Sequence, residues 1–153
     1  NKNIMKKNLL IITFICFGML TTKAQEEEEE EEEETFDLTI EVTGIKKTTG
    51  KVFIAVYDKK ENFLKDTEKL LRKKVIIENK KAVAQFKGLK KGEYAVSFFH
   101  DENDNNKMDT KIFGIPKEPY GFSNNATGVM GPPKFEDAKF LVDSNKTIQI
   151  KVN

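Results

Sequence analysis

The sequence predicts an all-β domain, a seven-stranded antiparallel sandwich of two sheets with Greek-key connections and one long loop. Three observations lead to this prediction. Several short segments alternate apolar and polar residues, which is the pattern of a strand with one buried face. Clusters of turn-forming residues separate these segments. Extended helical periodicity is almost lacking in the same region. A small barrel is the alternative architecture.

The first predicted strand covers residues 36–42, where apolar side chains alternate with Asp37, Thr39 and Glu41. A second strand starts at Val52, and the two are expected to form a hairpin. The polar segment 58–69 predicts a short helix or an irregular crossover. The other predicted strands cover residues 71–78, 81–86, 93–100, 135–142 and 146–152, with tight turns at 79–80 and 88–92.

Residues 1–24 have the layout of a secretory signal peptide. Lys6 and Lys7 form a basic start, residues 9–20 are apolar, and Ala24 is a small residue at the expected cleavage site. The apolar run is too short to remain as a membrane-spanning helix, which needs about 20 residues. The sequence therefore predicts an exported protein, periplasmic or extracellular, without stable membrane insertion after cleavage.

Cys16 is the only cysteine and lies inside that apolar run. A lipoprotein is the alternative interpretation, but Phe14 and Ile15 stand where small residues are expected. If cleavage follows Ala24, the mature protein has no disulfide. Packing, or a bound metal ion, must then stabilise the exported domain.

Residues 25–34 contain nine consecutive glutamates and predict a disordered linker. The β-domain is expected to span residues 35–153, to be mildly basic, and to be a monomer. Its lysines are scattered over strand positions instead of being gathered with aromatic residues, so no nucleic-acid partner is expected.

An Asp/Asn-rich loop follows the predicted strand 93–100. Because Ca²⁺ binds several oxygen ligands at about 2.3–2.6 Å, alternating carboxylates and amides favour a calcium-type site. The predicted metal ligands are Asp101, Asn103, Asn105, the backbone carbonyl of Lys107, and Asp109. Asp and Asn also favour turns for their own sake, and that is the competing explanation of the cluster.

Two positions depart from a helix-flanked calcium loop. The sixth is Asn106 instead of Gly, and the twelfth is Ile112 instead of a bidentate Glu. Asn tolerates the left-handed conformation that the sixth position needs. A distant carboxylate from Glu118, Glu136 or Asp137, or water, would have to complete the site. The predicted affinity for Ca²⁺ is therefore weak, about 10⁻⁴–10⁻³ M.

The loop 111–134 is too long for a simple connection and is rich in Gly, Pro and aromatic residues. Aromatic faces and amides suit sugar or peptide surfaces. The predicted ligand-binding residues are His100, Phe113, Tyr120, Phe122, Asn124 and Asn125. Two simpler explanations stay open: the aromatic side chains cap the end of the core, and His100 is a structural residue.

Several segments of the domain together carry a resemblance to a known family. They lie at 38–42, 44, 50–55, 92–96, 100–103, 107–110 and 114–124. These segments resemble one bacterial family, domain-of-unknown-function family 2141, whose members are small exported proteins. The resemblance covers nearly all of residues 35–152, and its most specific part is the run 100–124. It implies export and an immunoglobulin- or transthyretin-like sandwich, and no established activity.

The sequence thus predicts a non-enzymatic exported binding module. Calcium would organise the long loop for contact with a glycan, a peptide or another partner of the cell envelope. A purely structural accessory domain without ligand is the second hypothesis. An enzyme that uses Asp101, Asp109 and His100 in metal-assisted hydrolysis is the third.

Overall fold

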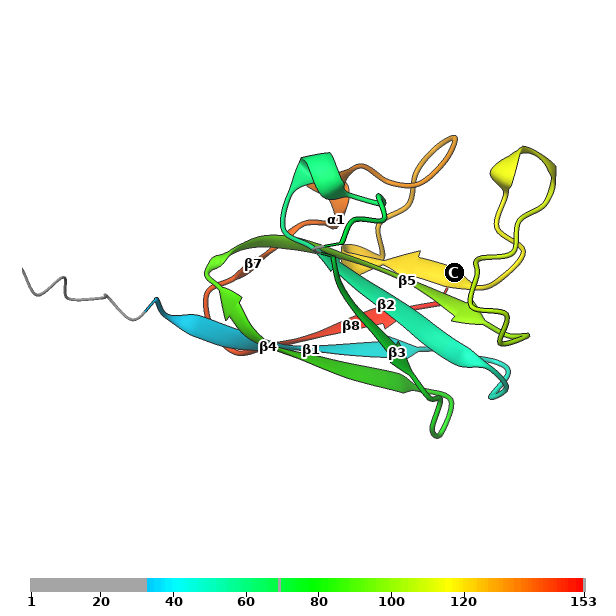
Figure 1. Ribbon diagram of the computed structural model, residues 1–153, viewed down its shortest axis with the longest axis horizontal. Helices are drawn as coiled ribbons and strands as arrows, with labels where there is room; N and C mark the ends of the chain where they lie inside the picture. Colours follow the sequence, from blue (N-terminus) through cyan, green and yellow to red (C-terminus); the bar gives the residue numbers. More distant parts are fainter. Residues whose placement is uncertain (1–32, 69, 153) are drawn as a thin grey trace, which may run out of the picture. The chain divides into compact units, whose positions relative to one another are not determined.

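A computed structural model describes residues 33–68 and 70–152, so the predicted signal peptide and most of the predicted linker lie outside the described residues. The described chain forms an all-β fold of two sheets with a few short helical turns (Figure 1). Its strands are β1 (Thr35–Thr43), β2 (Lys51–Tyr57), β3 (Leu71–Val75), β4 (Ala82–Lys90), β5 (Gly92–Asp101), β6 (Tyr120–Phe122), β7 (Phe140–Val142) and β8 (Lys146–Lys151).

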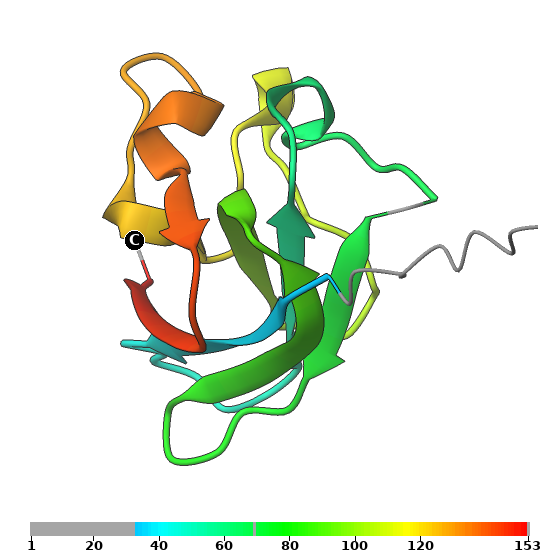
Figure 2. The same cartoon turned by 90° about the vertical axis from the view of Figure 1, so that its left-hand side faces the viewer.

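The first sheet has the strand order β4-β1-β8. Strand β1 is antiparallel to β4 and parallel to β8. The second sheet has the order β3-β2-β5-β6, and β7 pairs with the start of β5. Figure 2, turned by 90°, shows the chain passing repeatedly from one sheet to the other. Strand β5 therefore lies at the centre of the second sheet and ends at the Asp/Asn-rich loop.

The core lies between the two sheets, where the alternating apolar residues of their inner faces meet. Leu38, Ile40 and Val42 of β1 are fully buried, as is Val52 of β2, and Ile54 is 1% exposed. Each buried aliphatic side chain of this size contributes about 1.5–3 kcal/mol relative to an exposed one. The predicted alternation of these two strands is confirmed, because it places one face of each strand in this core.

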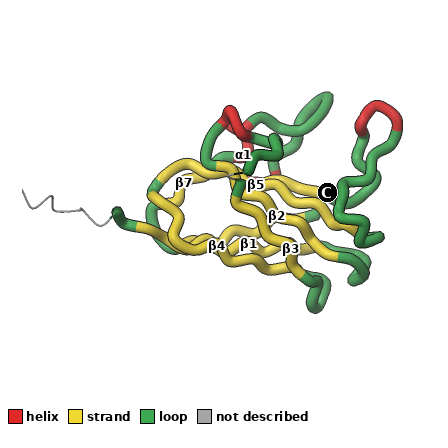
Figure 3. Tube along the Cα trace, in the orientation of Figure 1, coloured by secondary structure: helices red, strands yellow, loops and turns green. Residues whose placement is uncertain are grey.

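A second apolar cluster covers part of the outer face of the second sheet. Phe63, which follows the helical turn η1 (Lys60–Asn62), packs edge-on against Tyr57 and Phe135 with ring centroids 5.2 and 5.7 Å apart. Phe135 starts the short helix α1 (Phe135–Ala138). Figure 3 shows the helical turns lying outside the strands that form the two sheets. Aromatic pairs in this geometry add about 0.5–1.5 kcal/mol each to the effect of burial.

The strand count and the pairing differ from the prediction. The described residues contain eight strands instead of seven, because Tyr120–Phe122 pairs with β5 inside the segment predicted as loop. The pairing is not wholly antiparallel, since β1 and β8 run parallel. The predicted hairpin between the first two strands is wrong, because β1 and β2 belong to different sheets.

Two predicted boundaries are also wrong. Residues 88–90 continue β4 instead of forming a turn, and Gly88 takes a left-handed φ of 69° within the strand. Residues 135–138 form the helix α1, so only 140–142 of the predicted strand are extended. The tight turn at Asn79 and Lys80 is confirmed: both have positive φ, and Glu78 and Lys81 exchange two backbone hydrogen bonds. This is the geometry of a two-residue hairpin.

Candidate functional site

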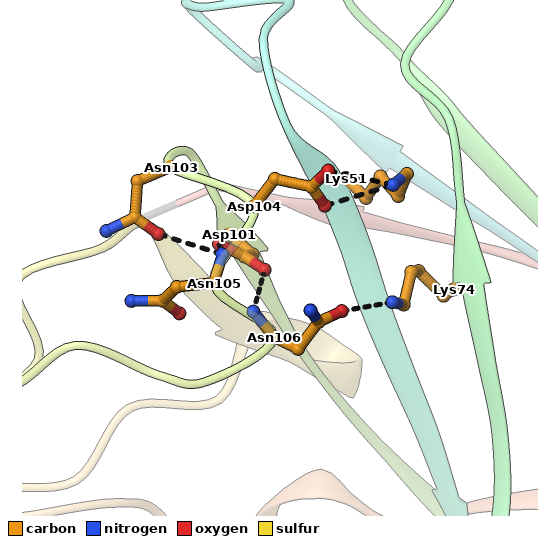
Figure 4. A network of polar contacts seen from close by, with 7 residues as sticks. All are labelled: Lys51, Lys74, Asp101, Asn103, Asp104, Asn105 and Asn106. Atoms are coloured by element: carbon orange, nitrogen blue, oxygen red, sulfur yellow. Dashed lines mark hydrogen bonds and ion pairs between the residues drawn. The ribbon is translucent and has the colours of Figure 1, made fainter.

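Asp101, the last residue of β5, anchors the Asp/Asn-rich loop. Its side chain is fully buried, and its two carboxylate oxygens accept backbone hydrogen bonds from Asn105 at 3.1 Å and Asn106 at 2.8 Å (Figure 4). These bonds turn the chain back over the end of the strand. Hydrogen bonds to a charged acceptor are stronger than those between neutral groups. Asp101 therefore holds residues 105 and 106 of the loop against the end of β5.

The other predicted oxygen ligands lie in the same loop and contact one another. Asn103 Oδ1 accepts the backbone N–H of Asn105 at 3.1 Å, and Asn105 Oδ1 accepts that of Lys107 at 2.9 Å. Asp109 closes the ring, because its carboxylate accepts hydrogen bonds from the side-chain amides of Asn103 at 2.7 Å and Asn105 at 3.1 Å. The structure thus brings Asn103, Asn105 and Asp109 together, and Lys107 joins them through its backbone N–H.

The backbone of this loop needs the left-handed conformation at two positions. Asp104 has a φ of 56° and Asn106 a φ of 66°. Asn and Asp reach this region more readily than other non-glycine residues. Asn106 at the sixth position therefore adopts the backbone that glycine usually supplies in a calcium loop.

Glu118 is the distant carboxylate that reaches the loop. It is 7% exposed, and its two oxygens accept the backbone N–H groups of Glu102 and Asp109, each at 3.0 Å. The other two candidates are engaged elsewhere. Glu136 pairs with Lys139 at 2.8 Å, and this contact lowers the pKa of its carboxyl. Asp137 accepts the backbone N–H of Lys134 at the start of α1.

Basic residues of the neighbouring strands surround the outer side of the loop. Lys51 of β2 binds both carboxylate oxygens of Asp104, at 2.9 and 3.0 Å (Figure 4). Lys74 of β3 donates a hydrogen bond to Asn106 Oδ1. Each exposed ion pair of this kind contributes only about 0–1 kcal/mol, so these contacts position the loop more than they stabilise it.

His100 is buried beneath the loop and is 1% exposed. Its Nε2 lies 2.7 Å from the backbone carbonyl oxygen of Thr49, and its backbone N–H donates to the carbonyl of Pro119 at 2.8 Å. A ring nitrogen beside a carbonyl oxygen acts as the donor. These two contacts hold His100 in place between the segment that leads into β2 and the residue before β6.

Residues 109–117 form a hairpin-like projection from the site. Lys117 donates a backbone hydrogen bond to Asp109, and Lys111 donates one to Ile115, at 2.8 and 2.6 Å. At the tip, the helical turn η2 (Ile112–Gly114) leaves Phe113 97% exposed. Of the predicted contact residues, Phe113 is thus the one presented fully to solvent.

The remaining predicted contact residues serve the fold. Phe122 is 7% exposed, and Tyr120 packs edge-on against it with ring centroids 5.9 Å apart. Asn124 donates its amide to the carbonyls of Lys139 and Asp137, at 2.9 and 3.2 Å. Asn125 Oδ1 accepts the backbone N–H of Lys151 at 2.8 Å. The aromatic residues of β6 therefore pack in the second apolar cluster on the outer face of the sheet, and not at the end of the sandwich core.

Sequence reasoning missed the apolar side chains that the long loop exposes. Ile112 at the hairpin tip is 79% exposed, and Val129 and Met130 are fully exposed on a second loop. The ribbon views show both loops projecting from the same side of the second sheet (Figures 1 and 2). The apolar tip beside Phe113 could have been noticed in the sequence, because Gly and Pro residues flank three large apolar side chains there.

The polar side chains of the site are carboxylates and amides, and the oxygens of Asn103 and Asn105 already accept backbone N–H groups. Within residues 33–68 and 70–152, no three His, Cys, Asp or Glu side chains lie close enough to hold a metal ion. A cation in this loop would therefore depend on two aspartates supplemented by amide and backbone oxygens. Ca²⁺ accepts such mixed oxygen ligands, and few charged ligands mean weak affinity.

Fold and site together define a small two-sheet β-domain with an Asp/Asn-rich loop at the end of its central strand. The family model described as "Uncharacterized protein conserved in bacteria (DUF2141)" matches residues 40–150, and the chain belongs to this family. The resemblance predicted from the sequence is therefore confirmed. No curated protein and no solved structure matches the chain. In the described part of the chain, no helix has the length and apolar character needed to cross a bilayer.

Proposed function

We propose that this protein is an exported, non-enzymatic binding module whose loop 101–109 binds Ca²⁺ weakly. The observation that carries the proposal is the ring of contacts joining Asn103 and Asn105 to Asp109, above the buried carboxylate of Asp101. Oxygen side chains at the first, third, fifth and ninth positions of a tight loop are the arrangement that calcium loops use.

The bound cation would hold the projection that starts at Asp109. Because Asp109 belongs both to the oxygen ring and to the base of the hairpin, an ion on its carboxylate restrains the hairpin as well. The tip presents Ile112, Phe113 and Ile115, which are 79%, 97% and 55% exposed. Exposed apolar side chains of this size favour contact with a partner. The partner class is a glycan, a peptide or another component of the cell envelope.

Calcium titration of matched variants tests the cation. Asp109→Asn removes a ligand charge at nearly constant shape, whereas Asp104→Asn removes a charge that faces Lys51 at the outer side of the same loop. Calorimetry should give binding heat for the parent and for Asp104→Asn, and none for Asp109→Asn at about 1 mM Ca²⁺. Absence of heat from the parent protein at that concentration ends the calcium proposal.

Partner contact has its own test. Glycan-array and envelope-peptide binding are compared between the parent and a variant with Ile112→Ser and Phe113→Ser, both of which change only exposed side chains. Binding that is present in the parent and lost in the variant supports the hairpin tip as the contact element. Equal binding by both proteins would mean that the partner contacts another surface of the domain.

A purely structural accessory domain is the second candidate. One observation favours it: in the described residues, every buried side-chain nitrogen or oxygen already has a hydrogen-bond partner within the protein. Such a loop is satisfied without an ion. Thermal melting in Ca²⁺ and in a chelator separates the two candidates, because only the first expects a higher melting temperature with Ca²⁺.

The same proposal includes the type of sandwich and the place of the protein in the cell. The alternating strands and the family resemblance support an immunoglobulin- or transthyretin-like sandwich. The layout of residues 1–24 supports export to the periplasm or beyond. A monomeric state is part of the same proposal.

A further inference from the structure

A groove of about 570 Å³ lies on the outer face of the second sheet, away from the sandwich core. Its floor crosses β2 and β5, one side is formed by β3, and residues 106–108 of the Asp/Asn-rich loop close one end. Pockets that hold small organic ligands have volumes of about 300–1,000 Å³. The groove therefore has the size of a ligand site, and neither the family nor the proposed cation accounts for it.

The groove exists because two small residues face each other on neighbouring strands. Ala55 of β2 pairs with Ser97 of β5, so the outer surface dips at this point. Larger side chains rise on both sides. Phe53 and Phe99 stack against each other with centroids 4.8 Å apart at one side, and Tyr57 stands at the other with its hydroxyl 3.1 Å from Ser97 Oγ. The floor is thus apolar with a single hydroxyl pair.

Cationic side chains outnumber anionic ones around this apolar floor. The charged side chains of Lys65, Arg72, Lys74 and Lys107 line the groove, and Asp66 is the acidic residue among its lining residues. Lys73 contributes only its backbone side, because its ammonium group lies over Phe86 on the other face of the sheet. Asp66 is already paired with Arg72 at 2.6 Å. The net positive rim attracts an anion, and the apolar floor favours an anion with a hydrophobic body.

Lys74 is held in place before any ligand arrives. Its ammonium group lies 4.7 Å from the centroid of the Phe53 ring and donates a hydrogen bond to Asn106 Oδ1 (Figure 4). Asn106 is itself fixed, because its backbone N–H binds the buried carboxylate of Asp101 at 2.8 Å. A preorganised charge costs less conformational entropy on binding than a free lysine side chain.

We propose that this groove binds an amphipathic organic anion, a small molecule with an aromatic or aliphatic body and one carboxylate, sulfonate or phosphate group. The body lies over Ala55 and Ser97 against the side of Phe53 and Phe99, and the anionic group meets Lys74 and Arg72. The proposal goes beyond the proposed function and does not require the cation.

A pair of fluorescent probes tests both parts of the recognition. 1-Anilinonaphthalene-8-sulfonate carries an aromatic body with a sulfonate, and N-phenyl-1-naphthylamine has the same rings without the charge. Titrations are made in buffer with a chelator, so their outcome is independent of calcium binding. The parent protein should bind the sulfonate saturably with one site, and the neutral probe about tenfold more weakly, which is the factor expected for one favourable charge contact.

Two variants and one control complete the experiment. Lys74→Gln should weaken sulfonate binding about tenfold and leave the neutral probe unchanged. Ala55→Leu fills the dip and should abolish binding of both probes. Lys87→Gln removes an exposed lysine from β4 in the other sheet and should change neither. Circular dichroism confirms that each variant is folded.

Other results would overturn the proposal. If the folded parent binds neither probe, the groove is not a ligand site of this class. If Lys74→Gln and Ala55→Leu both bind the sulfonate as the parent does, the probe is held elsewhere on the surface. Because Lys74 is exposed, its variant keeps the test decisive even if Ala55→Leu fails to fold.

Discussion

The side-chain hydroxyl of Ser123 binds the backbone of Val96 in β5, as a residue of a paired strand would. Ser123 Oγ accepts the backbone N–H of Val96 at 2.9 Å and donates to the carbonyl oxygen of Ala138 at 2.5 Å. Val96 lies between the part of β5 that pairs with β7 and the part that pairs with β6. A fully buried side chain therefore fills a gap in the hydrogen bonding of β5.

Ser123→Ala should lower the free energy of unfolding by about 1–3 kcal/mol, because it leaves a buried N–H and a buried carbonyl without their partner. Urea unfolding followed by circular dichroism measures the change. Ser144→Ala is the matched control, since Ser144 is exposed in the turn before β8. Equal stability of the two variants would mean that Ser123 is not needed to satisfy the edge of β5.

Gly50 is required where β2 starts beside the end of β5. A Cβ atom at this position would lie 1.8 Å from the carbonyl oxygen of Asp101, and the φ of Gly50 is +76°. Gly88 has a similar φ of +69°, but a Cβ atom there meets nothing within 4 Å. An alanine at Gly50 would therefore suffer both steric overlap and backbone strain, whereas an alanine at Gly88 would suffer backbone strain alone.

Gly50→Ala should reduce stability clearly more than Gly88→Ala, whose cost is limited to about 1–2 kcal/mol of left-handed strain. Thermal melting of both variants gives the comparison. We also expect Gly50→Ala to weaken calcium binding, because the displaced backbone belongs to Asp101. Similar melting temperatures for the two variants would show that the backbone at the end of β5 can shift away from residue 50 without loss of stability.

The sequence predicted strands well and their partners poorly. Alternation placed Leu38 and Val52 in strands with one buried face, since burial leaves a period of two in the residues. Pairing depends on residues far along the chain. The partner of Leu38 in β8 is Lys146, and no local pattern marks that parallel pairing.

The candidate site was predictable to a similar extent. The spacing of Asp101 and Asp109 predicted that they would lie in one loop, and Asn105 contacts the carboxylates of both. The role of Glu118 was one of three possibilities until the structure placed it. Phe113 and Phe122 look alike in a Gly- and Pro-rich segment, yet one is exposed and the other buried, because only Phe122 lies in a strand that pairs with β5.

Tyr57 should make the protein less stable in alkali. Burial raises the pKa of its phenol, and the hydrogen bond between its hydroxyl and that of Ser97 offsets this only in part. A pKa raised in the folded state gives stability that is complete below the unfolded pKa of about 10 and is lost as pH rises through the folded value. The stability of the parent should therefore fall above about pH 10.

Tyr57→Phe tests this dependence. The variant lacks the hydroxyl bond to Ser97, so we expect it to be less stable than the parent at about pH 8. The difference in unfolding free energy between the two proteins should become smaller toward about pH 11, because only the parent has this phenol to ionise. Urea unfolding at several pH values measures this difference in stability. Lysine titration affects both proteins alike, so it cancels in the comparison. A difference that stays constant with pH would contradict the burial effect.

Glu118→Gln tests how the two ends of the site are joined. The carboxylate of Glu118 accepts the backbone N–H groups of Glu102 and Asp109 with separate oxygens, and the amide of glutamine can accept only one of them. Bonds to a charged acceptor contribute about 1.5–3 kcal/mol each, so the loop should open more often in the variant. Amide hydrogen exchange at Glu102 and Asp109 should become faster, while exchange in the core strands changes little. Glu78→Gln, at an exposed position, is the control. Unchanged protection at both amides would mean that Asp101 and the side-chain amides hold the loop without Glu118.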